Sequence, residues 1–180
     1  MRTLSYFEKR DLNNMEKIGS YLSDLPLYCY DFFTGMELST SSLTRLNYAM
    51  DLAIFYDYLS RYVFNKKKEE ITLADLDKLE AKDIESYLSY LSYYVVDDKV
   101  YRNTENGKAR KLASVRSFFK YLFNHDLISK NVVSKVPTPK LHTKGIIRLE
   151  NDEVERLLDA VNAPTTFTER QKNYNKNTKI

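Results

Sequence analysis

Residues 108–124 read KARKLASVRSFFKYLFN, and this stretch decides the fold of the chain. Its apolar side chains fall within about a third of the circumference of an α-helix, in which successive residues turn by roughly 100°. They are Leu112, Val115, Phe119, Leu122 and Phe123. We therefore predict an amphipathic helix that begins at Thr104 or Asn106 and runs to about Asn124.

Two stretches nearer the N-terminus show the same periodicity. Residues 39–64 begin with hydroxyl side chains suited to an N-cap, and their apolar residues then recur at three- and four-residue steps: Leu43, Leu46, Met50, Ala53, Ile54 and Tyr58. Residues 82–97 place Ile84, Tyr87, Leu88, Leu91, Tyr94 and Val95 on one helical face. We predict a helix in each stretch and a polar loop over residues 99–106.

Shorter elements complete the N-terminal part of the chain. Residues 8–36 predict one or two short helices that are broken near Pro26. Thr72 stands three residues before Asp75, a spacing typical of a helix start, so residues 71–79 predict one short helical turn.

Proline ends the regular structure after the quoted helix. Residues 132–136 predict a short turn, and Pro137 and Pro139 follow it. Residues 138–148 indicate an extended basic linker, and residues 151–161 a further amphipathic helix. The predicted fold class is therefore all-α: a compact bundle of four to five helices, then a linker and one extra helix.

Composition excludes several classes of protein. With 43% hydrophobic and 29% charged residues among 180, the chain is neither disordered nor membrane-spanning. The single cysteine, Cys29, excludes an internal disulfide and is best interpreted as a small buried apolar group. His125 and His142 have no cysteine or carboxylate at ligand spacing, so we expect no metal and no cofactor. No signal peptide is recognisable, and we expect a cytoplasmic protein.

Positive charge is concentrated in one region. Residues 101–148 contain 11 basic and 2 acidic residues, whereas the rest of the chain contains 17 basic and 23 acidic residues. Such asymmetry indicates a polyanionic partner that meets one face of the protein.

The quoted helix carries five cations and no acid between Lys108 and Asn124. A helical wheel places Arg110, Ser114, Ser117 and Tyr121 opposite the apolar stripe, with Lys111 to one side and Lys120 to the other. Phosphates accept hydrogen bonds from Arg, Lys and Ser, and Arg or Ser can read base edges. The alternative interpretation is an ordinary basic, solvated helix face.

A second polar patch lies near the start of the helix predicted over residues 39–64. Helix N-termini attract phosphates, although capping and ordinary surface also account for these side chains. Together with the basic linker, the two patches give the candidate DNA-binding residues: Ser41, Ser42, Thr44, Arg45, Tyr48, Lys108, Arg110, Lys111, Ser114, Ser117, Lys120, Tyr121, Lys140, His142 and Lys144.

Three blocks of the sequence resemble one known family. Residues 110–122 resemble the fourth core-binding helix of the tyrosine recombinases, the family of phage integrases and Xer proteins, in which a basic start precedes a Leu-x-x-Leu-Arg-x-Phe-x-x-Tyr-Leu pattern. Residues 44–59 resemble the first core-binding helix, and residues 71–88 the second block. The resemblance spans roughly residues 25–160, with Val132 where the family usually has proline after Asn131.

The resemblance implies a SAM-like orthogonal bundle that binds duplex DNA as the N-terminal half of a site-specific recombinase. It implies an N-terminal helical extension over residues 1–38, a core-binding domain over 39–136, a basic linker over 137–150 and the start of a catalytic domain over 151–180. Expected partners are double-stranded DNA and other recombinase protomers, with no membrane and no small-molecule substrate.

The family's catalytic half supplies two Arg, a Lys, a His-x-x-Arg motif and a nucleophilic Tyr. His125 and His142 are followed three residues later by Ile128 and Gly145, so we expect that this chain is not an enzyme by itself. The alternative function is a helical protein–protein interaction module without DNA binding. An apolar groove bordered by tyrosines, with scattered cations, would favour that alternative.

Overall fold

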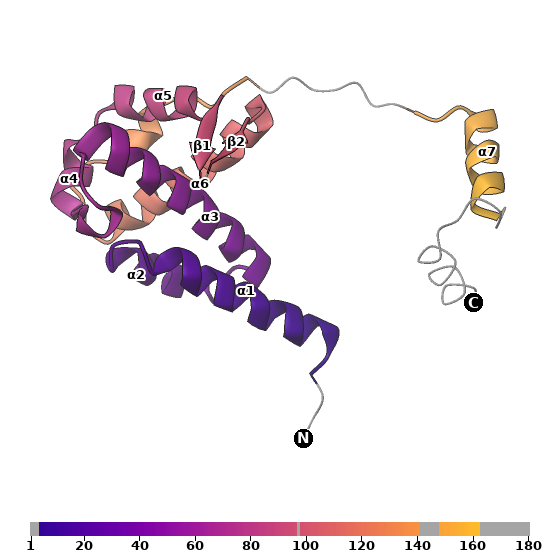
Figure 1. Cartoon of the computed structure of the whole chain (residues 1–180), viewed down its shortest axis with the longest axis horizontal. Helices are drawn as coiled ribbons and strands as arrows, with labels where there is room; N and C mark the ends of the chain where they lie inside the picture. The colour runs from indigo at the N-terminus through magenta and orange to yellow at the C-terminus, as the bar shows by residue number, and fades with distance from the viewer. Residues whose placement is uncertain (1–3, 97, 141–147, 163–180) are drawn as a thin grey trace. The chain divides into compact units, whose positions relative to one another are not determined.

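The computed structural model describes residues 4–96, 98–140 and 148–162 (Figure 1). The chain divides into two compact units, residues 1–141 and residues 142–180. The domain boundaries expected from the sequence stay a prediction. Each unit is described by itself.

The first unit is mostly helical, which confirms the all-α prediction. Its elements are α1 (Tyr6–Leu22), α2 (Tyr28–Met36), α3 (Ser42–Tyr58), the π-helical turn η1 (Leu59–Phe64), the 3-10 turn η2 (Lys68–Glu70), α4 (Leu73–Lys78), α5 (Ala81–Tyr90), β1 (Tyr94–Val96), β2 (Lys99–Tyr101), α6 (Glu105–Asn124) and the 3-10 turn η3 (Val132–Lys135). Among the described residues, the second unit contains α7 (Asn151–Asn162).

Hydroxyl side chains start four of the described helices, and the sequence predicts this for α3, α4 and α6. Ser5, Ser41, Thr72 and Thr104 are the N-caps of α1, α3, α4 and α6, and each accepts a hydrogen bond from the backbone N–H three residues later. Each such bond satisfies one of the donors that a helix N-terminus leaves unpaired. The predicted Thr72–Asp75 signal is confirmed as a reciprocal capping box.

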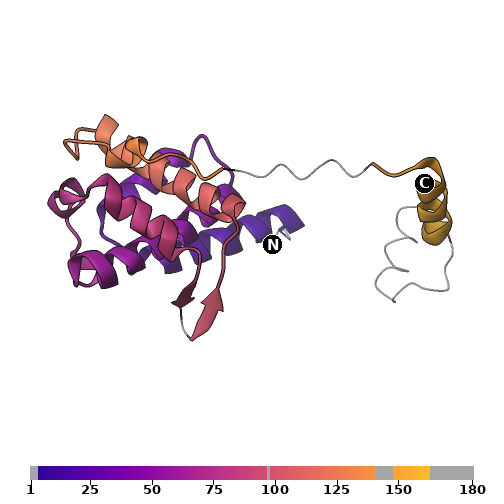
Figure 2. The same ribbon diagram turned by 90° about the horizontal axis from the view of Figure 1, so that it is seen from above.

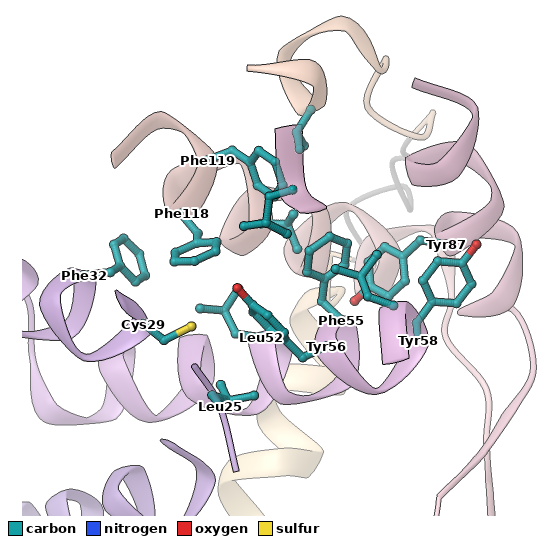
Figure 3. Packing of buried hydrophobic residues seen from close by; sticks show 14 of the residues in the cluster. Leu25, Cys29, Phe32, Leu52, Phe55, Tyr56, Tyr58, Tyr87, Phe118 and Phe119 are labelled. Carbon is teal, nitrogen blue, oxygen red and sulfur yellow. The ribbon is translucent and has the colours of Figure 1, made fainter. Parts of the chain in front are cut away.

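The core lies between α3 and α6, which are buried along much of their length. Phe118 on α6 packs edge-on against Phe32 on α2, with ring centroids 5.2 Å apart, and against Tyr56 on α3 at 6.2 Å (Figure 3). Cys29 is fully buried beside these rings, as expected, and burial raises the pKa of its thiol to about 12. The aromatic contacts fix α6 against α2 and α3.

The prediction of a helix over residues 82–97 is wrong beyond Tyr90, and the predicted loop over residues 99–106 begins with a strand. Helix α5 ends at Tyr90, and β1 and β2 pair as an antiparallel hairpin in which Tyr94 faces Tyr101. Their rings stack with centroids 5.3 Å apart. Aromatic and β-branched residues suit a strand, and Asp98 turns the chain with a positive φ of 59°. Figure 2 shows the hairpin projecting from the helices.

Helix α7 confirms the amphipathic helix predicted over residues 151–161. Its apolar residues Val154, Leu157 and Leu158 are exposed. Across the described ranges, none of the helices is both long enough and apolar enough to cross a bilayer.

Candidate nucleic-acid interface

Helix α6 carries most of the candidate residues, and its burial decides which of them can reach a partner. Leu112, Val115, Phe118 and Phe119 face the core and are fully buried. The buried surface is wider than the stripe predicted from the sequence, because α2, α3 and η3 all pack against this helix. Side chains outside the predicted apolar stripe are therefore buried as well.

A buried carboxylate on α3 organises the first half of α6. Asp51 is fully buried and accepts two hydrogen bonds from the Arg110 guanidinium, one to each oxygen, at 2.9 and 2.8 Å. Ser114 donates to the same carboxylate at 2.7 Å, and the Lys111 ammonium lies 3.6 Å from it. One anion thus holds two cations and a hydroxyl.

The two cations around Asp51 differ in exposure. The Arg110 side chain is 49% exposed, whereas that of Lys111 is 9% exposed. Burial lowers the pKa of Lys111; the Asp51 carboxylate opposes that effect, while the charge of Arg110 adds to it. The helical-wheel placement of Ser114 opposite the apolar stripe is wrong, because Ser114 is buried against Asp51.

The remaining cations of α6 have separate roles. Lys108 forms an ion pair with Glu105 at 3.0 Å, and its side chain is 14% exposed. Arg116 donates to the Thr138 hydroxyl at 2.6 Å and also to the Val136 carbonyl, so it ties the segment after η3 to α6. Lys120 is exposed on the outer surface.

Two further α6 candidates are half-buried. The Tyr121 ring packs edge-on against Phe32, with ring centroids 5.4 Å apart, and lies tilted against the His125 ring at 4.0 Å. It also adjoins Gly35. The helical wheel places Tyr121 opposite the apolar stripe, whereas in the structure Tyr121 packs against the core. Ser117 keeps part of its surface in solvent.

The patch at the start of α3 is mostly engaged within the protein. Ser41 caps the helix and its hydroxyl lies 2.9 Å from that of Thr44. Ser42 is buried, donates to Asp11 at 2.8 Å and accepts from Asn14 at 3.0 Å.

Arg45 and Tyr48 complete this patch. Arg45 donates to the carbonyls of Glu37 and Thr40 at 3.0 Å each, so its guanidinium closes the turn before α3. Tyr48 is half-buried, and its ring centroid lies 6.2 Å from that of Phe32. These contacts favour the capping and surface interpretation for Ser41, Ser42, Thr44 and Arg45.

In the predicted linker, Lys140 is exposed, whereas His142 and Lys144 lie outside the described residues. Exposed or half-exposed cations among the candidates are therefore Arg110, Lys120 and Lys140. Among the described residues, no three His, Cys, Asp or Glu side chains are grouped so that they could hold a metal ion.

Curated proteins similar in sequence identify the family. The chain is 33% identical over 170 residues to the tyrosine recombinase XerC of Caldanaerobacter subterraneus subsp. tengcongensis, which covers 91% of this chain and 46% of that protein. It is 28% identical over 153 residues to XerC of Chlorobaculum tepidum, covering 85% of this chain and 40% of that protein. The chain belongs to the Xer-like tyrosine recombinase family.

The tyrosine recombinase XerD of Listeria innocua shows 29% identity over 133 residues, which cover 74% of this chain and 40% of XerD. The chain spans less than half the length of these three recombinases. No family model matches the chain. No solved structure matches it either.

Sequence reasoning missed Asp51, the carboxylate on α3 that accepts hydrogen bonds from Arg110 and Ser114 of α6. Asp51 lies within the family-like block of residues 44–59. A signal did exist: Asp51 lies between Met50 and Leu52, a buried acid is usually paired, and residues 108–124 supply cations without acids. Asp51 and Arg110 lie 59 positions apart in the sequence, so no local pattern reveals the pairing.

Proposed function

We propose that this chain binds duplex DNA as the N-terminal, core-binding half of a site-specific tyrosine recombinase. The observation that carries the proposal is the 33% identity to a tyrosine recombinase across 91% of the chain. Exposed cations on α6 and on the following segment support it, because Lys120 and Lys140 present ammonium groups to solvent. Lysine and arginine side chains that neutralise phosphates supply most of the affinity of such contacts.

The proposal includes further recombinase protomers on the same DNA as partners. It also holds that strand transfer is not performed by this chain alone, since neither histidine begins a His-x-x-Arg motif. In this proposal α6 provides the main contact with one side of the duplex.

A salt titration tests DNA binding. The anisotropy of a labelled 30-base-pair duplex is followed with the chain at several salt concentrations. The logarithm of the association constant is expected to fall linearly with the logarithm of the salt concentration, by roughly 0.9 for each phosphate contact. A chain whose affinity for duplex is nil at low salt, or does not change with salt, would contradict the proposal.

A matched pair of lysines locates the contact. Lys140→Ala is expected to reduce the slope of the salt dependence by roughly the value of one phosphate contact. Lys17→Ala, which removes an exposed cation from α1, is expected to leave that slope unchanged. Equal effects of the two substitutions would show that net charge, and not a defined surface, governs binding.

One observation favours the second candidate, a protein–protein interaction module. A groove of about 450 Å³ lies between α1, α3 and the hairpin. Tyr21, Tyr94 and Tyr101 border it, and Met50 and Ile54 contribute apolar lining. Failure of the salt titration, combined with normal folding, would favour this candidate over DNA binding.

A further inference from the structure

The ion pair between Asp51 and Arg110 joins a buried side chain to a partly exposed one. The carboxylate is fully buried, yet the guanidinium that it holds is 49% exposed. A guanidinium has five N–H donors in a rigid plane. Two of them bond Asp51, one from each terminal nitrogen, so three donors remain for an acceptor outside the protein.

The carboxylate is itself held in place. Ser114 donates to the Asp51 oxygen that also accepts from Nη1 of Arg110, and Lys111 approaches the other oxygen at 3.6 Å. Both partners are buried on α6, whose aromatic side chains anchor it in the core. The plane of the Arg110 guanidinium is therefore fixed by groups that cannot easily move.

The charges at this cluster do not cancel. Two cations meet one carboxylate, so the cluster keeps one excess positive charge, and Arg110 is its exposed member. An arginine held in place loses less side-chain entropy when it binds than a free one, because its rotamer is already selected.

We propose that Asp51 is a positioning residue for DNA binding: it holds the Arg110 guanidinium with its outer edge towards solvent, ready to bind one backbone phosphate. This inference rests on the proposed function. It assigns to a buried acid a role in binding a polyanion that it never touches.

A purely structural ion pair would behave differently in one decisive way. If Asp51 merely tied α3 to α6, Asp51→Asn would remove a negative charge and leave DNA affinity unchanged or increase it. If Asp51 positions Arg110, the same substitution weakens binding although the net positive charge rises. The sign of the change therefore separates the two roles.

The experiment measures duplex affinity of the full chain by anisotropy at fixed low salt. Asp51→Asn is expected to weaken binding about three- to tenfold, the range that one newly mobile side chain gives. Glu16→Gln on α1 is the matched control, since it makes the same charge change at an exposed position; it is expected to leave affinity unchanged or slightly increased.

Two substitutions at Arg110 show whether the effect passes through the guanidinium. Arg110→Lys keeps the charge but cannot form the two-pronged bond, so its loss is expected to approach that of Arg110→Ala. In the Arg110→Ala background, Asp51→Asn is expected to change affinity by less than twofold. Equal losses from Asp51→Asn with and without Arg110 would overturn the inference.

Thermal unfolding confirms that each variant is folded at the temperature of the titration. Ser114→Ala serves as a milder variant that leaves all charges in place, and a smaller loss than that of Asp51→Asn is expected. Nitrogen-15 NMR of the Arg110 side chain gives a readout independent of DNA: slow guanidinium rotation in the unmodified chain and fast rotation in Asp51→Asn.

The outcomes separate the inference from the function on which it rests. Salt-dependent binding by the unmodified chain, with Asp51→Asn equal or tighter, overturns the positioning role and leaves the proposed function standing. Absence of duplex binding by the unmodified chain contradicts the proposed function, and the inference falls with it. Weaker binding by Asp51→Asn that depends on Arg110 supports both.

Discussion

The two halves of α6 use their cations in opposite ways. In the first half, Lys108, Arg110 and Lys111 all contact carboxylates of the same molecule, and two of the three side chains are nearly enclosed. In the second half, Arg116 bonds the segment after η3, and Lys120 faces solvent. A run of cations in a sequence therefore does not measure how many charges a protein offers to a partner.

The difference arises from which elements lie against each half. The first half passes the middle of α3, where Asp51 interrupts an apolar stripe and requires a counter-charge. The second half includes Arg116, which donates to the Val136 carbonyl directly after η3. The ion pairs of the first half are thus internal to the protein, and Arg110 is the member that still reaches solvent.

The largest effect is expected from removal of the shared anion. Asp51→Ala leaves Lys111 buried without a counter-charge, and breaking a buried ion pair in this way costs about 3–5 kcal/mol. Urea unfolding measures the loss. Lys120→Ala on the same helix is the control and is expected to change the free energy of unfolding by less than about 0.5 kcal/mol. Similar losses of unfolding free energy in the two variants would contradict the proposed difference between the two halves of α6.

A second buried carboxylate tests whether such clusters are sensitive to acid. Asp75 accepts hydrogen bonds from Lys66 at 2.8 Å and Lys78 at 3.2 Å, and also from Thr72. The bond from Lys66, then those from Thr72 and Lys78, hold the pKa of Asp75 well below its usual range, against an opposing effect of burial.

Because that pKa is lowered in the folded state, the stability from Asp75 is fully present above the unfolded pKa of about 3.9. It is lost as the pH falls below that value towards the folded pKa. Asp75→Asn is expected to cost about 1.5–3 kcal/mol at pH 7 and to flatten the loss of stability with acid. Unfolding curves at several pH values between 2 and 7 measure both effects, and an unchanged acid slope would contradict the assignment.

A smaller effect is expected at the start of α6. Thr104 accepts from the Gly107 N–H, so Thr104→Ala removes an N-cap, at a cost of about 1 kcal/mol. Thr104→Ser keeps the hydroxyl and is expected to restore most of the loss. Thermal unfolding of the pair measures the cap, and equal stabilities would show that the first turn of α6 is held by tertiary contacts alone.

Helical periodicity and capping predicted most of the fold. Interactions between residues close in the sequence determine three of these features, and such interactions can be predicted from the sequence. They are the start of α6 at Thr104, the capping box at Thr72 and the short turn at η3. Periodicity gives the wrong element over residues 91–97, because Leu91, Tyr94 and Val95 suit a helical face and a strand equally well. The stacking of Tyr94 on Tyr101 across the hairpin decides between them.

The candidate site was less predictable, for a physical reason. A helical wheel assumes one neighbour on one side, whereas α6 is packed against several elements. The wheel places Lys111 beside the apolar stripe and Ser114 opposite it, yet both are buried, because a partner helix decides whether such side chains are covered. That partner, Asp51 on α3, is set by tertiary structure and not by spacing along α6.

The salt dependence of duplex binding by Lys111→Met and Lys120→Ala tests most directly whether exposure decides which cations bind DNA. Both substitutions remove one positive charge from α6. Lys120→Ala is expected to reduce the slope by roughly 0.9, the value of one phosphate contact, and Lys111→Met to leave it unchanged. An equal reduction by both, or a reduction by Lys111→Met alone, would contradict the account.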